Sequence, residues 1–258
     1  MNKLNISNSI NIAMQSKGGG GKSVVSYLMA NYLKDKLGKT MLVDTDPNNQ
    51  TFTNYKALNV KSVNIIKKIG RERAIDPSQF DGFIEDFIEN DGAGLVDTGS
   101  GDFIYINSYL LSNEIPELLE EVGKQLVIHV PINYGSSQTE TMQCLLSICE
   151  NYPDTPVLVW GNEFYERSQT PLDIKSMNKK IGGNIIGIVM IEKGEAHTHE
   201  ADFKKLLTSG LIFSEVKESD QFRLLEKRRL MSLQKNIYNQ LDQIFDLNAP
   251  ETSEVVEG

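Results

Sequence analysis

The chain has 258 residues, of which 40% are hydrophobic and 24% charged, a composition ordinary for a globular protein with one large α/β domain or two small ones. A formal net charge of −9 argues against a surface that is basic throughout, as a DNA-coating protein would have, but leaves room for a local basic patch. The polar N-terminus, the absence of an apolar run long enough to span a membrane, and the presence of only two cysteines together predict a cytoplasmic protein.

Short apolar runs alternate with stretches of helical periodicity along the chain. Strands are expected at 10–15, 40–44, 62–67, 94–97, 125–130, 156–160 and 185–190. Helices are expected at 22–37, 80–88, 116–122, 139–149 and 219–245. Continuously apolar strands that are separated by helices are typical of a parallel sheet covered on both faces. We therefore predict a doubly wound, mostly parallel α/β fold in a single domain over 1–247, followed by a disordered acidic tail at 248–258.

A glycine run stands between the first expected strand and the first expected helix: Gly18, Gly19, Gly20 and Gly21. A phosphate chain needs donors without bulk, which the bare N–H groups of such a loop supply together with the positive end of the following helix. Lys22 is expected to reach the β- and γ-phosphates, and Ser23 to place its hydroxyl on Mg²⁺, with Val24 next to them among the binding residues. A flexible surface loop is the simpler alternative, but the flanking strand and helix disfavour it.

Two later strands are expected to end on aspartate. Asp44 and Asp46 stand at the end of the second strand, and Asp97 ends the strand at 94–97. Because ligands bind at the carboxyl ends of parallel strands, we expect these side chains near the glycine loop. Asp46 precedes a proline, so turn formation is the alternative for this pair. Aspartic proteases also carry Asp-Thr-Gly, but they need two such aspartates in an all-β scaffold, and the chain indicates neither.

The heptapeptide KGGGGKS resembles the deviant Walker A loop of the ParA/MinD family of ATPases, because Lys17 precedes the glycines and Ser16 replaces the first glycine of the general P-loop. The resemblance implies a P-loop NTPase fold, ATP and Mg²⁺ as cofactors, and slow hydrolysis of ATP to ADP and phosphate. It implies that Lys17 crosses the interface of a nucleotide-bound homodimer and that Asp46 orients the attacking water. It also implies that Asp44 and Asp97 hold Mg²⁺ through water.

Base recognition is expected at the end of the strand at 156–160. An asparagine at this place often reads adenine in the family, which makes Asn162 the candidate. A guanine reader would show the pattern N-K-x-D, whereas Glu163, Phe164 and Tyr165 follow Asn162 here. The sequence therefore favours ATP over GTP.

The stretch 44–60, together with 108–111, 160–164 and the region of Arg229 and Leu230, resembles the TraL-type and StbB-like ATPases of plasmids more than ordinary partition ATPases. This resemblance extends over about residues 10–245. It implies an ATP-dependent dimerisation switch in plasmid conjugal transfer or in plasmid maintenance and partition. DNA, or a DNA-binding transfer or partition protein, is the implied partner.

Several alternatives stay open. The loop also fits a small-molecule kinase or ligase of the dethiobiotin synthetase kind, or a nucleotide-binding scaffold with little hydrolysis. Basic residues form either a DNA-facing patch or a solvated helix face: Lys204, Lys205, Arg223, Lys227, Arg228 and Arg229. A metal site is disfavoured at a second polar cluster because a third ligand of known geometry is missing there: Glu195, His197, His199 and Glu200.

Overall fold

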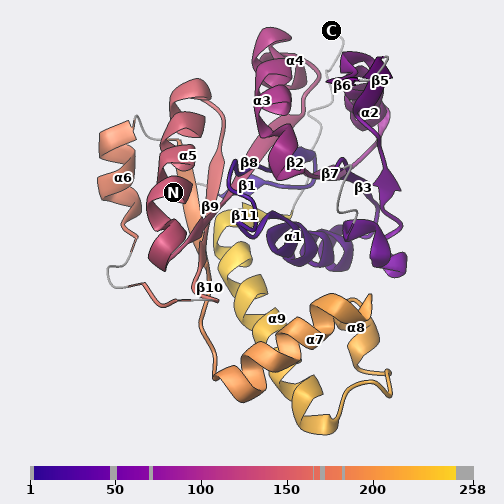
Figure 1. The fold of residues 1–258 in the computed structure, drawn as a ribbon, viewed down its shortest axis with the longest axis vertical. Coiled ribbons are helices and arrows are strands. Elements are labelled where there is room, and N and C mark those ends of the chain that lie inside the picture. Colours follow the sequence, from indigo (N-terminus) through magenta and orange to yellow (C-terminus); the bar gives the residue numbers. More distant parts are fainter. Residues whose placement is uncertain are drawn as a thin grey trace, which may run out of the picture.

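The computed structural model describes residues 3–46, 51–69, 72–164, 166–168, 172–181 and 184–247. Its strands are β1 (Leu4–Asn5), β2 (Ser9–Ala13), β3 (Thr40–Asp44), β4 (Lys61–Ser62), β5 (Ile66–Ile69), β6 (Glu72–Ile75), β7 (Ala93–Asp97), β8 (Gln125–Asn133), β9 (Val157–Asn162), β10 (Ile185–Ile191) and β11 (Phe245–Asp246). Its α-helices are α1 (Lys22–Leu37), α2 (Pro77–Glu89), α3 (Phe103–Ser112), α4 (Ile115–Glu121), α5 (Gln138–Asn151), α6 (Ile174–Ile181), α7 (Ala201–Ser209), α8 (Phe213–Val216) and α9 (Leu224–Ile244) (Figure 1).

Seven strands form one parallel sheet in the order β10–β9–β8–β2–β7–β3–β4. From the central strand β2 the chain first builds β3, β4 and β7 on one side, and later β8, β9 and β10 on the other. The direction of winding therefore reverses next to β2, which is where open α/β sheets bind ligands. The expected doubly wound fold is confirmed, and the glycine loop that follows β2 lies at its switch point.

Two apolar cores cover the two faces of the sheet. One core joins the sheet to α1, α7, α8 and α9 and contains Tyr27, Phe213 and Leu241. The other joins it to the helices from α2 to α6 and contains Phe87 and Leu145. Figure 1 shows α1 and α9 on one side of the sheet and the helices α2 to α5 on the other.

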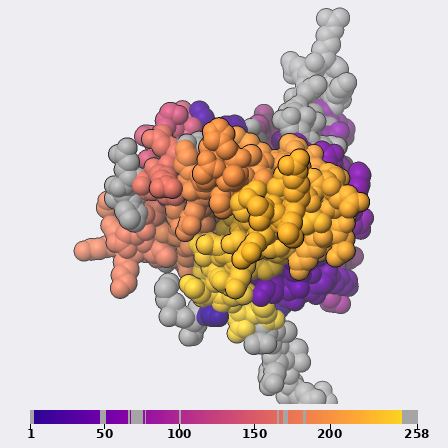
Figure 2. Space-filling view, turned by 90° about the horizontal axis from the view of Figure 1, so that it is seen from below, coloured from indigo at the N-terminus to yellow at the C-terminus, as the bar shows by residue number. Residues whose placement is uncertain are grey.

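Helix α1 is buried almost all round, with every residue from Val25 to Leu33 in the interior. A helix of this kind needs cover on the side away from the sheet as well. The lobe formed by α7, α8 and α9 provides it, and Figure 2 shows these segments, in orange and yellow, spread over that outer face. The C-terminal lobe is therefore packed against the helix that follows the glycine loop.

A polar network crosses the middle of the sheet. The Trp160 Nε1–H donates to His129 Nδ1 at 3.0 Å, so the ring proton lies on Nε2, which donates to Asn11 Oδ1 at 2.8 Å. Asn11 Nδ2 in turn donates to the carbonyl of Gly94 at 3.0 Å. Burial lowers the pKa of His129 to about 3, so the ring is neutral at pH 7. The network links β9, β8, β2 and β7 and opposes slippage of their register.

The structure differs from the sequence prediction in two places. The strand expected at 62–67 is wrong: Lys61–Ser62 pairs briefly with β3, and Ile66–Ile69 forms an antiparallel hairpin with Glu72–Ile75 outside the main sheet. The polar residue Asn64 and the two lysines that follow Ile66 interrupt the apolar run. An interrupted run of this kind is typical of an edge strand and not of a strand buried on both faces.

The long C-terminal helix begins at Leu224, later than the expected position 219, because Glu226 accepts from the backbone N–H of Arg223 and caps the helix there. The expected tail at 248–258 lies outside the described residues. Within the described part of the chain, every helix is too short or too polar to cross a bilayer.

Candidate functional site

The loop between β2 and α1 has the backbone geometry of an anion cradle. Gly19 and Gly21 have φ angles of +69° and +94°, a region that side-chain-bearing residues rarely enter. A Cβ on Gly20 would lie 2.7 Å from Gln15 Cγ and 2.9 Å from the carbonyl oxygen of Lys17. Since no side chain in the described part of the chain caps α1, the first N–H groups of this helix remain available to an anion.

A cavity of about 530 Å³ opens at this loop. The predicted site residues among its lining are Gly19, Gly20, Gly21, Lys22, Ser23, Val24, Asp46 and Asn162. The remaining lining residues are Thr98, Phe164, Phe203, Lys204, Leu207 and Thr208, four of which belong to α7. Gly18 is exposed at the start of the loop, outside this lining.

Lys22 lies at the base of the cradle and is 7% exposed. Its Nζ donates to the carbonyl of Gln15 at 2.9 Å. Burial lowers the pKa of Lys22, and the nearby carboxylates of Asp97 and Asp46 oppose that shift. The ammonium is thus held by a neutral carbonyl at a place where a phosphate oxygen would bind it more strongly.

Two aspartates stand side by side at the carboxyl edge of the sheet, since Asp44 and Asp97 are register partners of β3 and β7. Asp97 accepts from Ser26 Oγ at 2.7 Å and also from the side chain of Ser23, while burial raises its pKa to about 6. Asp44 Oδ1 accepts from the backbone N–H of Asp46 at 3.0 Å, and burial raises the Asp44 pKa to about 7. The sheet therefore brings the expected carboxylates together beside Ser23.

These donors fit a magnesium ion. The hydroxyl of Ser23 and the carboxylates of Asp44 and Asp97 are the oxygen ligands that Mg²⁺ prefers. Asp44 Oδ2 is fully buried and has no hydrogen-bond partner in the described part of the chain, which is costly unless a cation or a proton neutralises it. Among the described residues, no group of three or more His, Cys, Asp or Glu side chains is arranged to hold a metal ion by itself, either at this edge or at Glu195–Glu200. Phosphate oxygens and water would have to complete the ion's shell.

Lys17 lies outside the described lining of the cavity at the glycine loop. Its Nζ forms an ion pair with Glu140 Oε2 of α5 at 2.5 Å, with side chains 39% and 55% exposed, respectively. The pair borders a separate hollow of about 430 Å³ that Phe103 and Cys144 also line. The position is accessible from outside the chain, and the cross-subunit role of Lys17 stays a prediction.

Asn162 lies against the glycine loop at the end of β9. Its Nδ2 donates to Asn133 Oδ1 at 3.0 Å, and its Oδ1 accepts from the backbone N–H of Phe164 at 3.1 Å. A Cβ on Gly21 would lie 3.1 Å from the same Nδ2. One amide hydrogen and the carbonyl oxygen of the Asn162 side chain are already hydrogen-bonded, so the side chain has little capacity left for a base. Adenine recognition by Asn162 stays a prediction.

No protein-family profile matches the chain. A protein TraL from Escherichia coli is 30% identical over 240 residues, which cover 90% of this chain and 97% of the relative. The chain belongs to the TraL family. A second TraL protein from Escherichia coli is 29% identical over 240 residues with the same coverage. The TraL-type resemblance of the sequence is therefore confirmed.

Three solved structures are similar to this TraL-family chain at low identity. MinD of Aquifex aeolicus is 15% identical with a TM-score of 0.47, over 90% of this chain and 97% of that one. The cell division ATPase MinD of Pyrococcus furiosus is 16% identical with a TM-score of 0.48, over 90% and 99%. A protein assigned to plasmid partition in Borrelia burgdorferi, bound to AMPPNP, is 14% identical with a TM-score of 0.47, over 91% and 98%.

The TraL-family site contains residues that the sequence reasoning missed. Ser26 lies one helical turn after Ser23, a spacing that could have indicated its contact with Asp97. Asp102 is 4% exposed. A Cβ built on Gly99 would lie 2.5 Å from Asp102 Oδ2 and 3.2 Å from Asp46 Cγ, so the carboxyl groups of Asp102 and Asp46 are neighbours. Burial, together with Asp46, raises the Asp102 pKa to about 6. No local pattern indicated Asp102, because its burial arises from tertiary packing.

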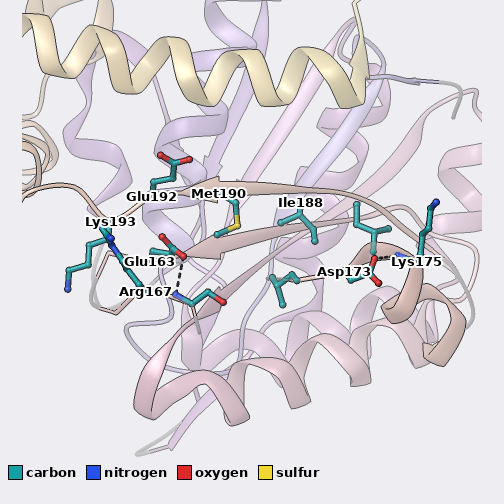
Figure 3. Close-up of a pocket in the computed structure, with 11 residues that line it drawn as sticks. Glu163, Arg167, Asp173, Lys175, Ile188, Met190, Glu192 and Lys193 are labelled. Atoms are coloured by element: carbon teal, nitrogen blue, oxygen red, sulfur yellow. Dashed lines mark hydrogen bonds between the residues drawn. The ribbon is translucent and has the colours of Figure 1, made fainter. Parts of the chain in front are cut away.

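A second hollow, of about 960 Å³, lies along the edge strand β10 of the TraL-family chain (Figure 3). Its apolar part is formed by Leu172, Ile174, Ile188 and Met190. Side chains of both charge signs surround them: Glu163, Arg167, Asp173, Lys175, Glu192 and Lys193. No glycine is among the described residues that line it. Size alone would favour this hollow, but the chemistry for a phosphate ligand gathers at the glycine loop.

Proposed function

We propose that this TraL-family chain binds ATP with Mg²⁺ at the glycine loop and hydrolyses it slowly. The observation that supports this most is the pairing of a preformed anion cradle with buried carboxylates. Positive-φ glycines, an uncapped helix and the Lys22 ammonium attract a polyphosphate, while Asp44 and Asp97 attract a cation. A magnesium nucleotide is the ligand that satisfies both groups.

Each residue then has a chemical role. Lys22 leaves the Gln15 carbonyl and binds the β- and γ-phosphates. Ser23 would hold Mg²⁺ directly and Asp44 and Asp97 would hold it through water, and the ion would neutralise the charge that develops on the phosphates. Asp46, in the cavity wall, orients the attacking water and accepts its proton.

Nucleotide binding is proposed to act as a switch in plasmid conjugal transfer or in plasmid maintenance and partition. Family resemblance supports a homodimer that closes when ATP is bound, with Lys17 reaching the nucleotide of the other copy. The accessible position of Lys17, outside its own cavity, is compatible with that reach. Binding and release of DNA, or of a DNA-binding transfer or partition protein, would be the output of the switch.

The direct test is calorimetric titration of ATP with Mg²⁺ into wild-type protein and Lys22→Ala. We expect micromolar binding by the wild type and a loss of about 100-fold or more in the variant, because a buried charge-assisted phosphate contact is removed. Lys39→Ala, at an exposed lysine beyond the end of α1, is the matched control and should bind like the wild type. Wild-type protein that leaves millimolar ATP unbound would contradict the proposal.

Hydrolysis is tested separately with Asp46→Ala. This variant should bind ATP as the wild type does but release phosphate at least about 100 times more slowly, because the water-orienting carboxylate is gone. Normal turnover would show that this role belongs to another group. Phosphate release that rises with a small-molecule acceptor, and not with DNA, would favour the kinase or ligase alternative.

A further inference from the structure

One wall of the cavity at the glycine loop contains none of the residues to which we assign a role in binding the phosphates or the metal ion. It is built by Phe203, Lys204, Leu207 and Thr208, whose spacing along α7 places them on one face of the helix. Phe164, which follows β9, completes the wall. An aromatic, apolar and cationic surface thus shares one cavity with the glycine cradle.

Phe164 and Lys204 are in contact within this wall. The Lys204 Nζ lies 5.1 Å from the centroid of the Phe164 ring, at cation–π distance. Phe203, which is buried, meets the same ring edge to face at 6.4 Å between centroids and 70° between planes. Phe164 itself is half-buried and borders the cavity.

The wall is fixed in place by bonds on its far side. Asp202, next to Phe203, accepts from Arg229 Nε of α9 at 2.5 Å. Lys205 forms an ion pair with Glu226 of the same helix at 2.8 Å. Tyr55 Oη donates to the carbonyl of Leu207 at 2.9 Å. Because α7 is held by neighbouring elements, its cavity face is preorganised for a ligand.

We propose that Phe164 is the surface on which the nucleobase stacks and that Lys204 donates to an acceptor of the base or ribose beside it. The proposal rests on the proposed nucleotide binding and adds the residues that bind its nucleoside end. A cavity with an anion cradle and an aromatic–cation wall suits a ligand that joins a polyphosphate to a flat ring. Every base offers a π face, so stacking on Phe164 supplies affinity, and hydrogen bonds from Lys204 add to it.

The test compares two ligands, Mg·ATP and magnesium tripolyphosphate, which has the phosphates but neither base nor ribose. Calorimetry is performed on the wild type, Phe164→Ala, Phe164→Trp and Lys204→Met. We expect Phe164→Ala to bind ATP about tenfold more weakly, as loss of one stacked base predicts, and Phe164→Trp to retain affinity. Lys204→Met, which keeps the aliphatic stem, should lose about fivefold. Tripolyphosphate affinity should stay within about twofold in all variants, which also shows that they are folded.

Lys205→Met is the matched control, because Lys205 is the next residue on α7 but pairs with Glu226 outside the cavity lining. Its ATP affinity should equal that of the wild type. Unchanged ATP affinity in Phe164→Ala and Lys204→Met, or an equal proportional loss for tripolyphosphate, would overturn the proposal. Wild-type protein that binds neither ligand would instead refute nucleotide binding itself, so the two failures are distinguishable.

Discussion

At the scale of single residues, the candidate site is electrostatically costly. Asp44, Asp97 and Asp102 are all buried at the carboxyl edge of the sheet, and burial raises the pKa of each above its ordinary value. Such groups keep a proton to a higher pH than an ordinary aspartate does, unless a cation approaches. The arrangement is therefore better explained as preparation for a bound ion than as a contribution to stability.

Asp102 allows this cost to be measured away from the expected magnesium ligands. Its folded-state pKa of about 6 lies above the unfolded value of about 4, so the folded chain holds the proton more tightly. Stability from this group is present below pH ~4 and is lost as the pH rises through ~6. Asp102→Asn should therefore exceed the wild type in unfolding free energy by up to about 3 kcal/mol at pH 7.5 and by little at pH 4. Urea titrations at both pH values measure this, and equal stability at pH 7.5 would contradict it.

At the scale of elements, α9 protects the open edge of the sheet. Gln240 accepts from the Met190 N–H at 2.7 Å and donates to its carbonyl at 3.1 Å, so one side chain replaces a neighbouring strand at that residue. The helix thus joins the C-terminal lobe to β10 as well as to α1. The contacts of α9 with β10 and with α1 fix the C-terminal lobe relative to the sheet. They therefore also hold α7, which carries Lys204, at a defined distance from the glycine loop.

Gln240→Ala should lower the unfolding free energy by about 1–3 kcal/mol, because two backbone groups of Met190 lose their partner. Asn239→Ala is the control, since Asn239 is exposed on the same helix and should change stability by less than about 0.5 kcal/mol. Denaturant unfolding of both variants provides the comparison. Equal effects at 239 and 240 would show that the edge is held by other contacts.

The strand–loop–helix unit could be predicted because its signals are local in sequence. Glycines, Lys22 and Ser23 are contiguous, and the aspartates end apolar strands. The α7 wall could not be predicted, since packing of the C-terminal lobe brings it to the loop from far along the chain. Lys204 shows the difference: its basic neighbours left a DNA-facing patch and a solvated helix face open, and neither alternative indicated its place in the cavity wall. Lys205 and Arg229, from the same basic set, are engaged in ion pairs.

At the scale of the whole molecule, the single chain keeps Lys17 bound to Glu140 of its own α5. A dimer that uses Lys17 across its interface has to break this exposed pair, which is worth about 0–1 kcal/mol and is therefore a small barrier. In the monomer Lys17 would pair with Glu140, and in the closed dimer it would bind the nucleotide of the second copy. Nucleotide supplied by the second copy would provide the stronger partner.

Lys17→Ala should accordingly bind ATP as a monomer with wild-type affinity but fail to form the ATP-dependent dimer. Glu140→Ala frees the same lysine and should dimerise at least as readily as the wild type. Sedimentation velocity with and without Mg·ATP separates the two species by mass. A Lys17→Ala protein that dimerises like the wild type would remove the cross-subunit role.

The most direct measurement is a crystal structure of the protein grown with AMPPNP and Mg²⁺. We predict the triphosphate along Gly19–Gly21, Lys22 moved from the Gln15 carbonyl to the phosphates, and the ion beside Ser23 and the carboxylates of Asp44 and Asp97. An empty glycine loop, with the nucleotide bound elsewhere or absent at millimolar concentration, would contradict the assignment of this site.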